Sequence, residues 1–508
     1  MPVYLLPLSR RQFLAGSTGT IGLELSHVRA NEVLRFRNAG PRETLEIGSE
    51  RQLFLDDHII ERIAGLKRTM HQPAKRGAVI KPDQKWEISL QTRCAPTWNE
   101  KQKLFKLWLI TSTNIPGLAG TSYVESKDGV NWTKPTLRQT TVNGSLENNL
   151  LAIVPGDEWP NNGIENVVID PDEPDPNRRY KGFYGVIGRR PMVSPDGIHW
   201  TLLKTAVLPS SDESNMSYDR ENKTFIATLK QGGPFGRSQR IWTSRDFNKW
   251  NDTGVLFHAD ELDQQLAKKN IHTRLRNRKL QQPVRNEPTE YNADIYNLGI
   301  FRYEGLYIGM PAVYHSTGKL KANTDGFQLI QLACSRDLRK WTRLGDRQSF
   351  IGPSPVGLDI FDRTQLLPPS APVERGDDLW FYYTGIKYRA SPENADEKVG
   401  AVCLAVLRRD GFVSLDARKS DGVLTTQPFV VRGEKIFVNV NVRNAGRLFV
   451  EALDKAGSVM ATSHDIRGDH RRGAVGWAQG TFSALNGKQV KLRFTLREAE
   501  LYSFWVGK

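Results

Sequence analysis

Cysteine is scarce in this chain of 508 residues, which contains only Cys94, Cys334 and Cys403. The three lie far apart and form no C-x-x-C pair, so we predict no cysteine-based zinc site. Cys334 and Cys403 stand in the apolar segments QLAC and AVCLAV. Free cysteines in such surroundings behave as small hydrophobic side chains, so we predict that both are buried.

Long apolar runs are also missing. No stretch of about 18 apolar residues occurs, so we expect no membrane-spanning helix. The sequence has no H-E-x-x-H, G-x-S-x-G, Walker or dinucleotide-binding pattern, and its histidines are scattered. We therefore predict neither a metal site nor a cofactor. With 39% hydrophobic and 25% charged residues, the composition excludes a wholly disordered or collagen-like chain.

The charge balance is positive. The chain has 71 Lys and Arg against 56 Asp and Glu, a formal net charge of +15, and this excess favours an anionic partner. Seven of the basic residues fall between 268 and 285, but no aromatic residue that could stack on a base is interleaved with them. We therefore predict no nucleic-acid partner, and expect 258–290 to be a solvated helix or loop over one face of the molecule.

The first thirty residues have the features of an export signal. Segment 9–14, SRRQFL, resembles a twin-arginine motif, and a mildly hydrophobic stretch rich in Gly and Thr follows it. We predict a twin-arginine signal over 1–30, a linker over 31–50 and a periplasmic or extracellular mature protein. A cut near Ala30 would remove three arginines and one glutamate, which lowers the formal charge from +15 to +13.

A short motif recurs along the middle of the chain. Upstream of each copy lies an apolar, aromatic run between turn residues, which is typical of a β-strand. Self-similarity at a long period indicates a repeat architecture. The motif, S-x-D-x-x-x-W, occurs at 126–132, 194–200, 244–250 and 335–341, and a degenerate copy, RRDGF, occurs at 408–412.

The repeated unit predicts a four-stranded antiparallel sheet, the blade of a β-propeller. Five units over 51–415 predict a five-bladed β-propeller. The tail over 416–508 has short alternating strands separated by Gly and Asn turns, which predicts a small antiparallel β-sandwich. We therefore expect an all-β protein with few helices.

Within each motif the Asp and the Trp have an expected structural role. The Asp can accept hydrogen bonds from the backbone amides of a hairpin turn, and the Trp is large enough to fill the space between two blades. We therefore exclude the motif carboxylates from catalysis. The motif aspartates are Asp128, Asp196, Asp246 and Asp337, and the motif tryptophans are Trp132, Trp200, Trp250 and Trp341.

The segments 53–73, 126–135, 170–184, 194–201 and 487–506 resemble exported bacterial proteins of the glycoside hydrolase family 32 N-terminal-like, five-bladed propeller superfamily, which also contains family 43. The resemblance covers about 50–508. It implies a central funnel in which carboxylates from different blades act on a glycosidic bond, and a β-sandwich packed against the propeller. The N-D-P nucleophile motif of family 32 is absent from 89–100, and so is its E-C acid motif, so no catalytic residue is carried over.

Chemistry and position narrow the choice of carboxylates. Glycoside hydrolysis needs one acid to protonate the leaving oxygen and one carboxylate as nucleophile or base. In a propeller such groups belong on the innermost strands, so we sought acids that open the first strand of each unit. A charged pair inside the apolar segment LFLDDHII also calls for a partner or a function. The acids found are Asp56, Asp57, Glu165, Asp212, Glu213, Glu290, Asp294, Asp359 and Asp362.

From these we select four catalytic candidates. Glu165 is expected to be the acid, Asp57 or Asp294 the ionised partner, and Asp359 a residue that tunes the pair. The candidate substrate-binding residues are Arg93, Arg189 and Arg237.

Two functions fit these features best. The first is an exported glycoside hydrolase-like enzyme that acts on a poly- or oligosaccharide, with an anionic glycan favoured by the charge. The second is a catalytically inactive carbohydrate-binding propeller, which the missing N-D-P motif favours. A protein-interaction scaffold is a third interpretation. A sialidase would need six blades and an arginine triad, whereas five units are counted here.

Overall fold

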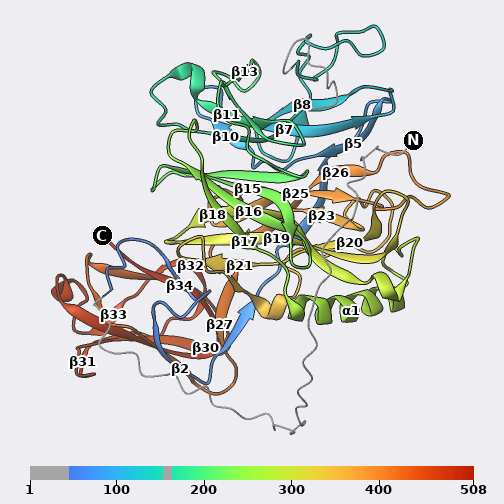
Figure 1. Cartoon of the computed structure of the whole chain (residues 1–508). Helices are drawn as coiled ribbons and strands as arrows, with labels where there is room; N and C mark the ends of the chain where they lie inside the picture. The colour runs from blue at the N-terminus through green and yellow to red at the C-terminus, as the bar shows by residue number, and fades with distance from the viewer. Residues whose placement is uncertain (1–44, 153–162) are drawn as a thin grey trace, which may run out of the picture.

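The computed structural model describes residues 45–152 and 163–508. The predicted export signal and most of the predicted linker lie outside these residues. The described chain is mainly β-strand, with one α-helix that is too short and polar to cross a membrane. Figure 1 shows a stack of sheets with the C-terminal strands, in red, to one side. The helices are α1 (Glu261–Arg276) and the 3-10 turns η1 (Pro176–Arg178), η2 (Pro288–Glu290), η3 (Gly345–Arg347) and η4 (Ser483–Leu485).

The first three sheets follow one another along the chain, and each is antiparallel. The first contains β5 (Glu87–Gln91), β7 (Leu104–Thr113), β8 (Ala119–Ser126) and β9 (Trp132–Thr133), with β6 (Thr97–Asn99) also on β7. The second contains β10 (Ile164–Ile169), β11 (Tyr180–Tyr184), β12 (Arg190–Ser194) and β13 (Thr201–Leu202). The third contains β14 (Ser214–Asp219), β15 (Thr224–Gly233), β16 (Gly236–Ser244) and β17 (Asn251–Phe257).

The fourth and fifth sheets complete the series. One strand of the fifth sheet, β4, comes from a segment that precedes the first sheet in the chain. The fourth contains β18 (Asn292–Tyr303), β19 (Leu306–Lys319), β21 (Ala333–Ser335) and β22 (Thr342–Arg343), with β20 (Thr324–Ile330) also on β19. The fifth contains β23 (Gln365–Leu367), β25 (Asp378–Ile386), β26 (Gly400–Arg408) and β4 (Ala74–Ile80), with β24 (Val373–Arg375) on β25.

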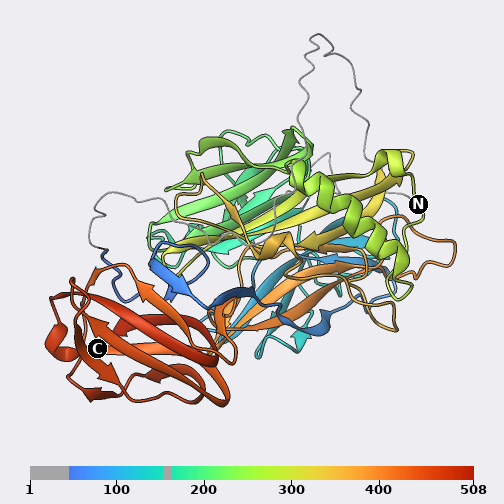
Figure 2. The same ribbon diagram turned by 90° about the horizontal axis from the view of Figure 1, so that it is seen from below.

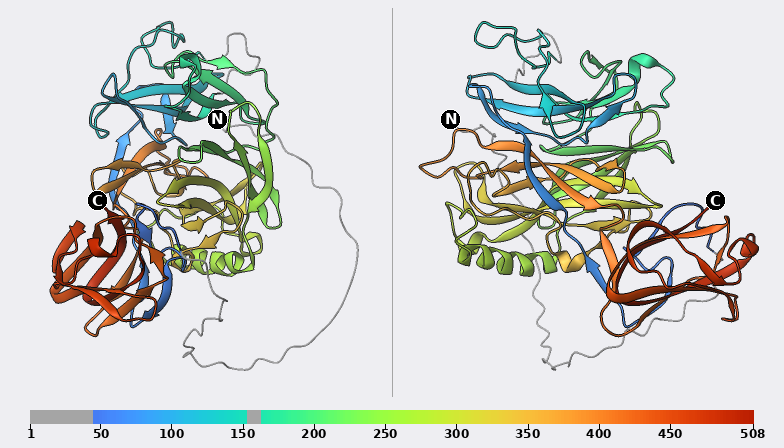
Figure 3. Two further views of the ribbon diagram at one scale, coloured as in Figure 1. Left: turned by 90° about the vertical axis from the view of Figure 1, so that its left-hand side faces the viewer. Right: turned by 180° about the vertical axis from the view of Figure 1, so that it is seen from behind.

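Consecutive sheets contact one another near their innermost strands. Strand β10 contacts β7 of the preceding sheet, β14 contacts β10, β18 contacts β14, and β23 contacts β20. The first and fifth sheets are joined at their edges, because Ser89 of β5 pairs in parallel with Gly400 of β26, so that the two form one ten-stranded sheet. The left part of Figure 3 shows the sheets side by side in this order. The predicted all-β fold with five blade-like sheets is confirmed.

Each motif tryptophan joins its sheet to the one before. In every case the indole ring lies against an aromatic ring of the neighbouring sheet, which is where the sequence placed it. The pairs, with their centroid distances, are Trp132 and Tyr382 at 5.9 Å, Trp200 and Trp108 at 6.5 Å, Trp250 and Phe183 at 5.2 Å, and Trp341 and Phe257 at 5.7 Å.

The motif aspartates are used by their own turns. Asp196 Oδ1 accepts hydrogen bonds from the backbone N–H groups of Ile198 and His199, at 2.8 and 2.9 Å. The same two bonds recur at the other three motifs. These carboxylates stabilise hairpins, as the sequence indicated.

The C-terminal strands form a separate sheet system that also includes strands from the N-terminal side. Strands β1, β2 and β3 pair with β34, β28 and β27, because Phe54, Ile59 and Ile60 belong to the hydrophobic core of this part. The predicted propeller span of 51–415 therefore includes strands at both ends that pair with the C-terminal part instead. The strands of the C-terminal part are β1 (Gln52–Leu53), β2 (Ile60–Ala64), β3 (Lys67–Met70), β27 (Val413–Ala417), β28 (Gly422–Thr426), β29 (Phe429–Val430), β30 (Lys435–Leu453), β31 (Val459–Ser463), β32 (Gly468–Ala474), β33 (Trp477–Gln479) and β34 (Gln489–Gly507).

One buried carboxylate ties the two parts together. Asp410 has no exposed surface and pairs with Arg51 Nη1 at 2.6 Å. It also accepts hydrogen bonds from the hydroxyls of Tyr303, in the fourth sheet, and Ser503, in β34. Since a buried charge is costly without partners, this cluster fixes how the sandwich sits against the propeller.

The basic segment 258–290 folds mainly into α1. The helix packs against β18 and β19 through Ala267 and Ile271, and most of its other residues are exposed or partly exposed. Figure 2 shows it lying along the sheets. This agrees with the predicted solvated helix over one face of the molecule.

Candidate active site

Charged side chains from three sheets meet beside the innermost strands. Arg93 follows β5, Glu165 is the second residue of β10, Arg189 precedes β12, and Glu213 precedes β14. We call these four residues the carboxylate cluster. All four are buried or nearly so, with side-chain exposures between 0% and 11%.

Arg93 and Glu213 form a two-point ion pair. Arg93 Nε lies 2.5 Å from Glu213 Oε2, and Arg93 Nη2 lies 2.8 Å from Glu213 Oε1. Asn297 Nδ2 donates a further hydrogen bond to Glu213 Oε2 at 3.2 Å. The planar guanidinium matches a carboxylate in this geometry, so both oxygens of Glu213 are held in one orientation.

Glu165 has a different set of partners. Its Oε2 accepts hydrogen bonds from Arg189 Nη2 at 2.7 Å and from the Ser214 hydroxyl at 3.1 Å. Arg189 Nη2 also donates to the backbone carbonyl of Asp212. Arg189 Nε and Nη1 have no hydrogen-bond partner in the described part of the chain. Glu165 is therefore held through one oxygen, whereas Glu213 is held through both.

These surroundings move the pKa values of the two carboxyls apart. Burial raises the pKa of Glu165 to about 7, against the charge of Arg189 and with a further increase from the Glu213 carboxylate. Burial also disfavours the ionised form of Glu213, but the charge and hydrogen bonds of Arg93 outweigh it and lower the pKa of Glu213 to about 2. Near neutral pH Glu165 is therefore partly protonated while Glu213 is ionised, and two carboxyls whose pKa values are moved apart in this way are typical of acid–base catalysis.

A second group of polar side chains adjoins the cluster. Arg237 Nε pairs with Asp294 Oδ2 at 2.8 Å, and the Asp294 side chain is only 5% exposed. Lys230 Nζ pairs with Asp212 Oδ2 at 2.6 Å and lies 3.5 Å from the centroid of the Tyr296 ring. Tyr296 and Asp294 lie in β18, so the fourth sheet borders the cluster on this side.

The structure brings together five of the seven residues selected from the sequence. Glu165, Arg93 and Arg189 are in the cluster, and Asp294 and Arg237 pair beside it.

The other two selected residues lie elsewhere. Asp57 stands between β1 and β2, strands of the C-terminal sheet, where its half-exposed carboxylate pairs with Arg68 at 2.6 Å. Asp359 is exposed, has a φ of 60° and pairs with Lys81. Neither contacts the cluster, because Asp57 lies in a connection between two strands of the C-terminal sheet and Asp359 lies in a surface loop between η3 and β23.

Glu213 is the functional candidate that the selection missed. It was one of the acids found at a strand start, so its position in the sequence already indicated that it could lie on an innermost strand. Its importance comes from Arg93, which lies 120 residues earlier in the chain. No local pattern indicates that this arginine and this glutamate meet.

Metal-binding geometry is a separate question. Within 45–152 and 163–508, no group of three or more His, Cys, Asp or Glu side chains is placed to hold a metal ion. The cluster offers acids and guanidinium groups, which suit proton transfer and the binding of oxygen-rich ligands.

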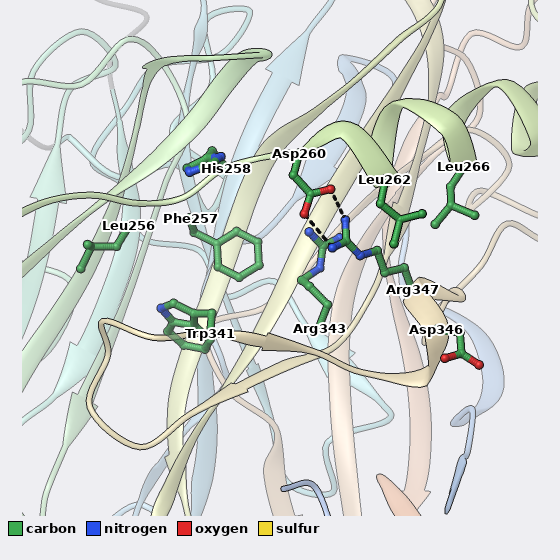
Figure 4. Close-up of a pocket in the computed structure, with 10 residues that line it drawn as sticks. All are labelled: Leu256, Phe257, His258, Asp260, Leu262, Leu266, Trp341, Arg343, Asp346 and Arg347. Carbon is green, nitrogen blue, oxygen red and sulfur yellow. Dashed lines mark hydrogen bonds and ion pairs between the residues drawn. The ribbon is translucent and has the colours of Figure 1, made fainter. Parts of the chain in front are cut away.

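A pocket of about 600 Å³ lies away from the cluster, where α1 meets the third and fourth sheets (Figure 4). Asp260 faces it, but both of its oxygens accept hydrogen bonds from Arg347, at 2.5 and 2.7 Å, which lower the pKa of Asp260 to about 2. Asp260 is therefore ionised near neutral pH and is not suited to donate a proton there. For this reason we place the candidate chemistry at the cluster. The pocket is lined by Leu256, Phe257, His258, Asp260, Leu262, Leu266, Trp341, Arg343, Asp346 and Arg347.

Comparison with known proteins gives similarities of structure. No family model and no curated protein matches the chain. A glycoside hydrolase is similar at 13% identity and a TM-score of 0.42, over 66% of this chain and 92% of that one. A fructofuranosidase variant from Schwanniomyces occidentalis, complexed with fructosylnystose, is similar at 11% identity and a TM-score of 0.38, over 84% and 96%. A family 32 β-fructofuranosidase of Bombyx mori is similar at 8% identity and a TM-score of 0.37, over 86% and 95%.

Proposed function

We propose that this protein is a glycoside hydrolase-like enzyme that acts on a poly- or oligosaccharide, with Glu165 as the acid and Glu213 as its ionised partner. One observation carries the proposal. Two buried carboxyls of neighbouring sheets have pKa values shifted in opposite directions, Glu165 upward and Glu213 downward. Glycoside hydrolysis needs this difference, because one group must give a proton while the other stays negative.

The proposed chemistry uses only groups of the cluster. Glu165 donates its proton to the oxygen of the glycosidic bond, and the bond to the anomeric carbon breaks. The Glu213 carboxylate stabilises the positive charge that develops on the sugar ring. Water then adds to the anomeric carbon, and the proton that it loses returns to Glu165. Arg93 keeps Glu213 ionised and oriented throughout.

The test compares carboxylate variants on a panel of poly- and oligosaccharides. Glu165→Gln should lower the rate of hydrolysis by at least about a hundredfold, since a general acid contributes that much or more. Glu213→Gln should do the same. Asp57→Asn is the matched control, because it neutralises a carboxylate that pairs with Arg68 outside the cluster. Parent-like activity in both cluster variants, with a parent that cleaves a glycan, would refute the assignment.

A second candidate function is carbohydrate binding without catalysis. The observation that favours it is the saturation of Glu213, whose two oxygens both accept hydrogen bonds from Arg93. A parent protein that binds glycans from the panel and releases no reducing ends would support this alternative. Carbohydrate is the proposed ligand in both cases, and the formal charge of +15 favours an anionic one.

We also propose export by the twin-arginine route. The support is the pair Arg10 and Arg11 in the segment SRRQFL, which lies outside the described residues. Replacing both arginines by lysine should keep the protein in the cytoplasm of a host that has this pathway. Fractionation of cells that express the parent and the double variant measures the outcome, and equal export of the two would contradict the proposal.

A further inference from the structure

Two guanidinium groups share one pair of tyrosine rings beside the carboxylate cluster. Arg237 Cζ lies 5.0 Å from the Tyr296 centroid and 4.4 Å from the Tyr314 centroid. Arg389 Cζ lies 5.7 and 5.6 Å from the same two centroids. We call Arg237, Tyr296, Tyr314 and Arg389 the arginine–tyrosine group. It draws its members from the third sheet, from the fourth sheet and from the segment after β25.

The carboxylates around this group do not balance its charge. Asp294 pairs with Arg237, but Arg389 forms no ion pair with any carboxylate in 45–152 or 163–508. Arg389 donates from Nε to the Thr324 carbonyl at 3.2 Å and from Nη1 to Gln365 Oε1 at 3.4 Å. Burial disfavours the charged form of the Arg389 guanidinium, but the Tyr296 and Tyr314 side chains outweigh it and raise the pKa, so Arg389 stays charged. Its buried Nη2 has no hydrogen-bond partner among the described residues. A largely buried cation without a counter-ion is costly unless an anion completes it.

The wider site has the same imbalance. Since Glu165 is protonated over part of the neutral range, positive charge exceeds negative charge around the site. Asp294 Oδ1 is also buried without a hydrogen-bond partner. It could accept a hydrogen bond from a sugar hydroxyl beside a bound anion. The cations are Arg93, Arg189, Lys230, Arg237 and Arg389, and the carboxylates are Glu165, Asp212, Glu213 and Asp294.

We propose that Arg389, with Arg237, forms a subsite for an anionic substituent, a carboxylate or a sulfate, on the sugar ring that occupies the cluster. The identification of the ligand as a sugar rests on the function proposed above. The planar guanidinium of Arg389 can present two N–H groups to two oxygens of such a substituent. The tyrosine faces hold the guanidinium in place through cation–π contacts. Tyr296 also contacts Lys230, which joins the subsite to the rest of the site.

The experiment measures binding by calorimetry at 0.1 M salt with two matched pairs of probes. An oligogalacturonate and its methyl ester test a carboxylate, and dextran sulfate and dextran test a sulfate. The parent should bind the charged member of at least one pair at least about tenfold more tightly than the neutral member, as expected for a charge-assisted hydrogen bond. The pair that shows the difference identifies the anion. Equal binding of charged and neutral members, or no binding of any probe, would overturn the proposal.

Variants separate the subsite from general attraction to a basic protein. Arg389→Gln should weaken binding of the preferred charged probe by at least about tenfold. Arg389→Lys should recover part of the loss, because it restores the charge without the planar fork. The control is Arg220→Gln, which removes the same charge from an exposed arginine that pairs with Asp172. Equal losses in Arg389→Gln and Arg220→Gln would overturn the proposal, and melting temperatures show that each variant is folded.

Hydrolysis assayed on the same four probes distinguishes the two proposals. If the parent cleaves a charged probe and Arg389→Gln neither slows that cleavage nor weakens binding of the probe, the subsite is wrong and the proposed enzyme function stands. If charged probes bind through Arg389 and no probe is cleaved, the subsite stands and the enzyme function fails.

Discussion

Arg93 and Glu213 form a buried two-point contact, with Arg93 Nε 2.5 Å from Glu213 Oε2 and Nη2 2.8 Å from Oε1. The arginine belongs to the first sheet and the glutamate to the third, and the second sheet lies between them in chain order. This contact keeps Glu213 negative, and the Glu213 charge adds to the effect of burial, which is the main cause of the raised pKa of Glu165.

Loss of Arg93 should destabilise the protein. Arg93→Gln leaves the Glu213 charge buried without its main partner, and breaking such a pair costs about 3–5 kcal/mol of unfolding free energy. Urea denaturation measures the change. The matched control is Arg432→Gln, since Arg432 makes the same two-point contact with Glu46 at 2.8 and 3.1 Å, but between two exposed side chains. Equal stability losses in the two variants would contradict the role assigned to burial.

Hydrolysis should depend on pH through Glu165. The proposed acid must be protonated, and burial raises its pKa to about 7, so activity should fall as the pH rises through that value. Glu213 stays ionised far below neutral pH, because Arg93 outweighs the effect of burial on its pKa. A profile of kcat/KM from pH 4 to 9 tests this expectation. An alkaline limb that persists in the residual activity of Glu165→Gln, or no limb at all in the parent, would argue against Glu165 as the acid.

The contact between the first and fifth sheets should be sensitive at Gly129. This residue has a φ of 80°, and a Cβ added to it would lie 2.5 Å from the Tyr382 hydroxyl of the fifth sheet. Gly129→Ala therefore combines a left-handed backbone penalty of about 1–2 kcal/mol with a steric clash of about 1–3 kcal/mol.

Gly144→Ala is the control for that experiment, because Gly144 has a φ of 79° and no atom within 4 Å of the added Cβ. It isolates the backbone penalty. Thermal unfolding of the two variants gives the difference, and identical melting temperatures would show that the contact between Gly129 and Tyr382 contributes nothing.

Truncating a motif tryptophan should loosen two neighbouring sheets. Trp200 is partly buried and packs against Trp108, so Trp200→Ala should cost about 3 kcal/mol, the lower end of the range for a core tryptophan. Trp98→Ala serves as the comparison, because Trp98 is 39% exposed and should cost less. An unchanged melting temperature for Trp200→Ala would contradict the proposed role of the repeated motif.

The sequence determined the repeated turns and much of the site. The S-x-D-x-x-x-W pattern is local, since its Asp bonds amides two and three residues away, so it could be recognised from spacing alone. The position of Glu165 and Asp294 was also readable from local sequence, because turn residues and apolar runs mark where the first strand of each repeated unit begins.

Tertiary structure decided which of those acids act together. The sequence suggested that Asp57 is a buried charge within an apolar strand, but Asp57 lies between two strands of the C-terminal sheet and its carboxylate is half-exposed. Glu213 stood at a strand start like several other acids, and only the fold brings Arg93 to it from 120 residues away. A carboxyl's pKa depends on burial and on the charges within a few ångströms, and these are set by long-range contacts that no local spacing records.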